Sequence, residues 1–291
     1  MTIPIIHSMM VNNGQTLVMP PWEAGQTKWG DLAIPEVYVA GTERLYPTGT
    51  IFRKGIRTFV YTKYVAGITV VGAGYCLEST AEVKDVTNGV ISGAAGASTL
   101  IVDMGGSIAE NAYAGGFIGI KMGTGGGTTA GRYSTYQIIS NTVSDANDRV
   151  TFTIDGALVL ALTTADDVII TENPYAEVRT TLNLYGMTVG INLQTTEASL
   201  YCWLQTGGPN NMLSQLIALE GDTVNSIAVY NVAGVPQVVA GGAAGASTLG
   251  GIEVAMLQRI GYVYASTDIG GPGGSPADIT VSPPVWLSIF N

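Results

Sequence analysis

The sequence has little of the chemistry on which most enzymes rely. Its 291 residues include one histidine, His7, and two cysteines, Cys76 and Cys202. A Ser-His-Asp or Cys-His arrangement would have only His7 to use, and a zinc site built from His and Cys needs three or four ligands. The cysteines lie in apolar surroundings, which favours buried free thiols over a disulfide. We therefore expect a protein that is not an enzyme, with no catalytic residue, no metal and no cofactor.

Charged residues and long apolar runs are also scarce. Only 12% of the chain is charged, against about 25% in an average soluble domain. The mean hydropathy is +0.31, yet no continuous apolar run reaches the length of a membrane-spanning helix, so no membrane partner is expected. The N-terminus lacks the basic and apolar segments of a signal peptide, which predicts a chain kept in a reducing cytoplasm. The apolar surplus is then expected inside the fold or against partner subunits.

The charge is acidic and unevenly spread. The net charge is −10, with +2 in residues 1–64 and −12 in the remaining 227. An acidic body argues against nucleic-acid binding, because phosphate contacts require a basic surface. The densest basic cluster, Arg53, Lys54, Arg57 and Lys63, alternates with aromatic residues. We expect it to face an acidic protein partner or to be the outward side of strands, rather than to bind single-stranded nucleic acid.

What the sequence has in abundance is glycine and β-branched residues, which favour strands joined by tight turns. A hairpin is predicted at 50–61, with Lys54-Gly55 at its turn, and short strands are predicted at 68–71, 81–86, 99–102, 116–121, 136–139, 150–154 and 168–171. Two further strands are predicted at the C-terminal end, at 260–264 and 285–290. Helix is limited to a turn near 107–113 and a segment at 211–219. The predicted fold class is all-β, an antiparallel β-sandwich or barrel-like domain or domains with an extended N-terminal arm.

Proline sets the first boundary. Prolines and two tryptophans recur through residues 1–47, a segment with no apolar periodicity of its own, which predicts an extended arm. A β-rich domain is expected at 48–179 and a second one at 180–291, either separate from the first or packed with it as one unit.

Three local patterns invite stronger interpretations. The sequence Gly-Ala-Ala-Gly-Ala-Ser-Thr-Leu occurs at 93–100 and again at 242–249, and we interpret both copies as turns that lead into strands. The glycine run at 121–131 is followed by aromatic and β-branched residues rather than a helix, which favours a hairpin loop over a nucleotide-binding loop. The aspartates at 145, 148, 155, 166 and 167 stand beside turn residues, and we expect solvated turns rather than a calcium site or an acid–base pair.

Several segments resemble the capsid decoration (cement) proteins of tailed bacteriophages and related virion proteins. The resemblance covers about two thirds of the chain. The segments that carry it are Arg44-Leu-Tyr-Pro-Thr-Gly-Thr, Arg57-Thr-Phe-Val-Tyr-Thr-Lys-Tyr, Tyr113-Ala-Gly-Gly-Phe-Ile-Gly-Ile, Tyr136-Gln-Ile-Ile-Ser-Asn-Thr, Asn173-Pro-Tyr-Ala-Glu-Val and Pro284-Val-Trp-Leu-Ser-Ile-Phe.

The resemblance implies a non-enzymatic structural protein of the virion. Such a protein is assembled in the host cytoplasm, binds the outer surface of the capsid shell, and stabilises contacts between capsomers. Its implied partners are the major capsid protein and further copies of itself, as a homotrimer, with no nucleic acid, membrane or small-molecule substrate. The candidate contact residues are Trp22, Trp29, Arg44, Tyr46, Arg53, Lys54, Arg57 and Trp286.

Two alternatives stay open at this point. A fibre or tail-associated virion protein that binds a receptor or glycan would use exposed Trp and Tyr side chains on loops to stack on sugars. A glycoside-degrading virion enzyme would use a pair of carboxylates. A glycan array and an assay on polysaccharides test these two alternatives.

The oligomeric state gives the first testable prediction. We expect light scattering coupled to size exclusion to report trimers for the full-length chain, because the apolar surplus then lies between subunits. Trimers from a chain lacking residues 1–47 would assign the subunit interface to the body. A full-length monomer would contradict the prediction and favour the carbohydrate-binding alternative.

Overall fold

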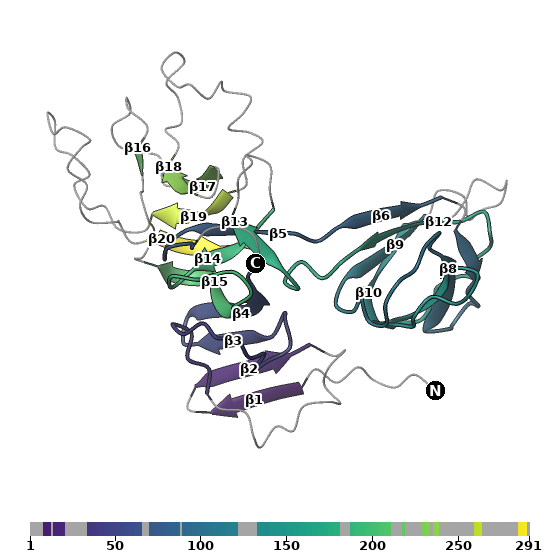
Figure 1. The fold of residues 1–291 in the computed structure, drawn as a ribbon, viewed down its shortest axis with the longest axis horizontal. Coiled ribbons are helices and arrows are strands. Elements are labelled where there is room, and N and C mark those ends of the chain that lie inside the picture. Colours follow the sequence, from purple (N-terminus) through teal and green to yellow (C-terminus); the bar gives the residue numbers. More distant parts are fainter. Residues whose placement is uncertain are drawn as a thin grey trace, which may run out of the picture. The chain divides into compact units, whose positions relative to one another are not determined.

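The structure is a computed structural model that describes residues 8–12, 14–20, 34–65, 70–87, 89–121, 133–180, 187–210, 217–218, 228–232, 235–238, 259–263 and 285–289. Within these residues the fold is all-β, which confirms the predicted fold class: there are strands β1 to β20 and no helix (Figure 1). None of the described residues forms a helix of the length and hydropathy that crossing a membrane requires.

The chain divides into two compact units. Unit 1 is built on Ala81–Ala176, and unit 2 on Met9–Val18, Gly30–Thr80 and Glu177–Asn291. The main segment of unit 1 is therefore inserted between two segments of unit 2. Its end at Ala176 lies close to the expected boundary at 180, whereas its beginning at Ala81 was not expected. The reason is a long-range pairing, because Val178 lies opposite Ser79 in an antiparallel ladder. The chain thus returns to unit 2 beside the strand from which it left.

Unit 1 holds seven antiparallel strands in the spatial order β6-β12-β9-β10-β11-β8-β7. Strands predicted at 81–86, 99–102, 116–121, 136–139, 150–154 and 168–171 each overlap one of them. Their bounds are β6 (Val83–Val86), β7 (Val90–Ser92), β8 (Thr99–Asp103), β9 (Phe117–Lys121), β10 (Tyr133–Asn141), β11 (Arg149–Ile154) and β12 (Asp167–Thr171).

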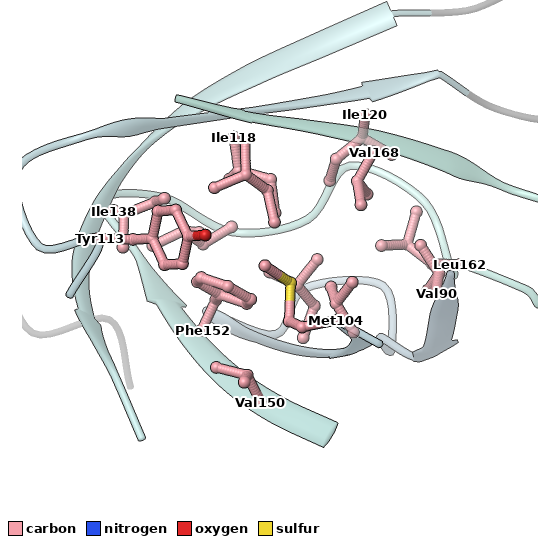
Figure 2. Packing of buried hydrophobic residues seen from close by; sticks show 14 of the residues in the cluster. Val90, Met104, Tyr113, Ile118, Ile120, Ile138, Val150, Phe152, Leu162 and Val168 are labelled. Atoms are coloured by element: carbon pink, nitrogen blue, oxygen red, sulfur yellow. The ribbon is translucent and has the colours of Figure 1, made fainter. Parts of the chain in front are cut away.

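The sheet of unit 1 curls around one core. Strands β7 to β12 each contribute at least one side chain to a single buried cluster, and Val86 of β6 packs against it. Figure 2 shows these side chains converging, with Phe152 and Met104 among them. The two edge strands, β6 and β7, follow each other in the chain, and Lys84 of β6 donates a hydrogen bond to the carbonyl of Met104 beyond β8. Unit 1 is thus consistent with the antiparallel β-sandwich of the predicted fold class.

The connections of unit 1 agree in part with the sequence. Tyr133 lies opposite Lys121, so the glycine run joins two antiparallel strands, as predicted. The first copy of the internal repeat leads into β8 at Thr99, as predicted, whereas the second copy lies outside the described residues. The helical turn expected near 107–113 is instead a series of turns. The side chain of Asn141 holds them through hydrogen bonds to Tyr113 N (2.8 Å) and Ala109 O (2.9 Å).

Unit 2 holds the larger sheet, whose main path runs β1-β2-β3-β4-β15-β20-β19-β17-β18-β16. Strand β14 pairs with β15 and β5, and β5 pairs with β13. The bounds are β1 (Ser8–Asn12), β2 (Gln15–Met19), β3 (Ile51–Lys54), β4 (Arg57–Lys63), β5 (Cys76–Ser79), β13 (Val178–Thr180), β14 (Thr188–Asn192), β15 (Tyr201–Asn210), β16 (Ile217–Ala218), β17 (Ala228–Val232), β18 (Val235–Val238), β19 (Arg259–Val263) and β20 (Val285–Ser288).

The N-terminal segment is partly built into this sheet. Strand β2 pairs with β3, placing Leu17 opposite Phe52, and both side chains are buried. Val37 and Tyr46 are buried in the same cluster. Removing residues 1–47 therefore removes core side chains, and the truncated chain is expected to lose stability as well as any contact surface.

Other sequence predictions in unit 2 have mixed outcomes. The hairpin at 50–61 is confirmed as β3 and β4, with Gly55 in the left-handed region at a φ of 59°. The strands at 260–264 and 285–290 correspond to β19 and β20. The strand at 68–71 is not formed at Val71, which makes a single bridge to Thr196, and the segment 211–219 contributes only the short strand β16 to the described residues.

The two cysteines are buried free thiols, as the sequence predicted. Cys76 lies in β5 and Cys202 in β15, and neither side chain is exposed. Burial raises the pKa of the Cys202 thiol to about 12 and that of Cys76 also well above its usual value. Both therefore act as small apolar side chains at neutral pH.

Ion pairs reinforce the place where the chain leaves unit 2 and returns to it. Arg179 Nε donates to Glu78 Oε1 at 2.7 Å across β13 and β5, and Glu78 is almost fully buried. Lys63 Nζ lies 2.9 Å from Glu177 Oε1, and this hydrogen bond is the main cause of the raised pKa of Lys63. Removing Arg179 would leave the buried charge of Glu78 uncompensated, so this pair favours the pairing of β13 with β5.

Gly208 of β15 gives a stability prediction. Its φ is 83°, and a Cβ on it would collide with the backbone at Ile56 and Arg57. We expect Gly208→Ala to lower the free energy of unfolding by about 3 kcal/mol, since backbone strain adds to a clash that no rotamer relieves.

The matched control is Gly55→Ala. Gly55 also has a left-handed φ, but a Cβ there meets no atom within 4 Å. It should cost about 1 kcal/mol, the strain alone. Urea unfolding of both variants measures the difference, and equal losses would contradict the close approach of β15 to the hairpin.

Candidate interaction site

Residues 34–47, here called the strap, cross the β4 and β15 side of unit 2. Their inward side is buried: Val37 and Tyr46 join a core cluster with Phe59, Tyr61 and Trp203 among its members. The Gly41 backbone also exchanges hydrogen bonds with Tyr201 of β15 at 3.0 and 2.7 Å. The strap is thus fixed to the sheet along its length by side-chain packing and by backbone pairing.

Trp203 is the centre of this packing. The ring centroids of Tyr46, Phe52 and Tyr61 lie 5.2, 5.8 and 5.0 Å from that of Trp203, at tilted or edge-on angles. Such pairs each add about 0.5–1.5 kcal/mol beyond the burial of their area. Because Tyr46 belongs to the strap and the other three to the sheet, this cluster attaches one to the other.

The hydroxyl of Tyr61 holds the last part of the strap. It accepts a hydrogen bond from Leu45 N at 3.2 Å and donates to Glu43 O at 3.4 Å. Burial raises the pKa of Tyr61 to about 12, so the phenol stays protonated and both bonds persist at neutral pH. The backbone at 43–45 is therefore fixed while the Leu45 side chain points outward, 63% exposed.

The outward side of the strap is also apolar. Ile34, Tyr38, Val39 and Leu45 are all exposed, although their backbone is held against the sheet. Single exposed apolar residues are common on monomers, but a run of them on a fixed segment is typical of an interaction surface.

Arg57 joins the strap to the hairpin tip, residues 53–57. Its guanidinium donates to Tyr38 Oη (2.8 Å) and to Gln205 Oε1 (3.0 Å), and it stacks 4.8 Å from the centroid of Phe59. Among the described residues these partners are all neutral, so the positive charge of Arg57 is oriented by them but not cancelled.

Gln205 completes this network from below. It is fully buried in β15, and its amide nitrogen donates to the carbonyls of Gly207 (3.1 Å) and Pro209 (2.8 Å). Its carbonyl oxygen accepts from Asn210 at 3.1 Å as well as from Arg57. The amide of Gln205 therefore links the irregular part of β15 to Arg57 at the hairpin tip. A substitution in either segment is expected to disturb the hydrogen bonds of the other.

The structure brings together some of the predicted contact residues and separates others. Exposed side chains are found at Arg44, Arg53 and Lys54. Lys54 is the cross-strand partner of Arg57 and shares a face of the hairpin with it, whereas Arg53 lies on the other face. Tyr46 is 4% exposed, so its expected place on a contact surface is corrected: its ring fills the space beside Trp203.

The three remaining predicted contact residues are tryptophans. Trp22 and Trp29 lie outside the described residues. Trp286 lies in β20 opposite Pro209, and its side chain is outside the described part.

The sequence alone did not identify Tyr38, Leu45, Ile56 or Gln205. Nothing in the local pattern marks Tyr38 as a partner of Arg57, since the two lie 19 positions apart and in different segments. The sequence did contain a signal for the exposure of Leu45 and Ile56. Leu45 directly follows Arg44 and Ile56 directly precedes Arg57, both in stretches rich in turn residues. Gln205 stands within an apolar strand, where a buried amide needs partners from other segments.

The described residues hold no group of three or more His, Cys, Asp or Glu side chains placed to bind a metal ion. No protein-family model, curated protein or solved structure matches this chain.

Arg57→Met tests the network. The substitution keeps an apolar stem over Phe59 but removes both guanidinium hydrogen bonds, and we expect the free energy of unfolding to fall by about 1–2 kcal/mol. Arg53→Met is the control, because Arg53 is exposed on the other face of the same hairpin, and it should change stability by less than about 0.5 kcal/mol. Urea unfolding, monitored by tryptophan fluorescence, measures both free energies of unfolding. Similar losses for the two variants would contradict a stabilising role for the hydrogen bonds of Arg57.

Proposed function

We propose that this protein is a non-enzymatic structural component of a tailed-phage virion, a decoration protein that binds the outer surface of the capsid shell through its strap. The observation that carries the proposal is the two-sided apolar character of the strap. Val37 and Tyr46 fix its inner side, and Val39 and Leu45 remain exposed on its outer side. A surface held in place before binding loses little conformational entropy when a partner covers it.

The partner is the major capsid protein, on the virion surface. Support comes from the resemblance of Arg44-Leu-Tyr-Pro-Thr-Gly-Thr and the following strand to decoration proteins, since this segment contains the last four residues of the strap and leads from it into β3. The exposed Arg44 lies next to the exposed Leu45, which suits a shell surface that is apolar with acidic groups around it. Many copies on one shell would be retained even if each contact is modest.

Co-sedimentation with purified heads of the phage that carries the gene tests this function. The wild-type protein should pellet with the heads to a fixed stoichiometry and raise the temperature at which they disrupt. Val39→Asp/Leu45→Asp should weaken binding at least tenfold, because two charges would be buried in the contact.

The control is Val143→Asp, which changes an equally exposed apolar residue in unit 1. It should leave head binding unchanged. A wild-type protein that stays in the supernatant would refute the proposed function, and equal binding by the control and the strap variant would remove the strap from it.

A further inference from the structure

A second apolar surface lies on unit 1, on the outside of its curled sheet. Side chains of β9 and β12 alternate, so that Ile118, Ile120, Val168 and Ile170 enter the core and their neighbours point outward. The register aligns the outward residues in rows across β6, β12 and β9: Val83, Thr171 and Phe117 form one row, and Asp85, Ile169 and Gly119 the next.

This outer face is apolar at its middle. Val83, Ile169 and Phe117 are 65%, 48% and 41% exposed, although all three belong to regular, well-paired strands. Gly119 stands beside Ile169 without a side chain, and a Cβ there would meet no atom closer than 3.8 Å. The face therefore offers an open place between apolar neighbours, suited to one side chain of a partner.

The surroundings of the outer face are acidic. Glu82 and Asp85 are exposed, Asp167 and Glu172 are half-buried, and Lys121 is the basic residue in its rows, 3.9 Å from Asp167. Lys84 lies on the other side of β6 from Val83 and Asp85, where its ammonium group donates to the carbonyl of Met104. Residues 81–176 contain ten acidic and four basic residues, a net charge of −6.

The hairpin tip of unit 2 has the opposite character. Residues 53–57 contain three basic residues and no acidic one. Ile56, 66% exposed, stands at the tip between Lys54 and Arg57, and Arg53 precedes them. The tip thus presents one apolar side chain surrounded by positive charge, and the outer face presents an apolar centre surrounded by negative charge.

We propose that the hairpin tip of one copy of this chain binds the outer face of unit 1 in a second copy. Charge complementarity selects this occupant: Lys54 and Arg53 face Asp85 and Glu82, and Ile56 covers the space over Gly119. The contact is heterologous, since two different surfaces meet, and repetition of it gives a closed ring or an open chain of copies. The inference goes beyond the proposed function, because it involves neither the shell nor the outer side of the strap.

Two charge-reversal variants test the contact. The first, Arg53→Glu/Lys54→Glu, alters the hairpin tip. The second, Asp85→Lys/Ile169→Lys, alters the outer face. All four side chains are exposed. Light scattering should report oligomers for the wild-type chain that weaken as salt is added, and a single-chain mass for each variant. Val159→Lys, at a 70% exposed residue of unit 1 outside these rows, should associate like the wild type.

Mixing the two variants gives the decisive result. Each retains one intact surface, so an equimolar mixture should form one dimer of defined mass and nothing larger, which also shows that both variants are folded. A wild-type chain that stays monomeric at its highest soluble concentration, variants that still associate, or a mixture without dimers would each overturn the contact. Because no capsid is present, a failure here is separate from a failure of head binding.

Discussion

The packing of Tyr46, Phe52 and Tyr61 around Trp203 is the interaction on which the rest of unit 2 depends. It joins three strands of the sheet to a segment that has no regular structure of its own. Large aromatic side chains gain the most from burial, so this cluster can fix a segment whose backbone makes few ladder bonds. Without it the strap would have no defined inner side, and therefore no defined outer side either.

The same cluster governs the charged side chains at the surface. Phe52 stacks on Phe59, and the guanidinium of Arg57 stacks on Phe59 in turn, so the position of a surface charge follows from the packing below it. Gln205 and Tyr38 then fix the rotation of the guanidinium. The acidic outer face of unit 1 is built differently, from strand register alone. One surface is held by packing and hydrogen bonds and the other by strand pairing, which lowers the entropic cost of covering them.

Local patterns were sufficient to predict much of the fold, and long-range pairing was not. Strand β11 was predictable because Val150, Phe152 and Ile154 alternate with polar residues, and the hairpin at Gly55 because its turn chemistry is local. The insertion of unit 1 rests on Ser79 meeting Val178, which no local pattern encodes. At the site, the exposed basic residues were predictable from composition, but Tyr46 was not, since its burial depends on a tryptophan 157 positions away.

The paired strands β5 and β13 also determine an order of events during synthesis. The buried core of unit 1 comes from the single segment Ala81–Ala176, so it can form as soon as Ala176 has left the ribosome. Strand β4, made more than a hundred residues before its neighbour β15, must wait until unit 1 has been synthesised. Its aromatic side chains stay without their final partners for that interval. The insertion therefore makes unit 2 the slow-folding part of the protein, and the part that most needs protection from association while nascent.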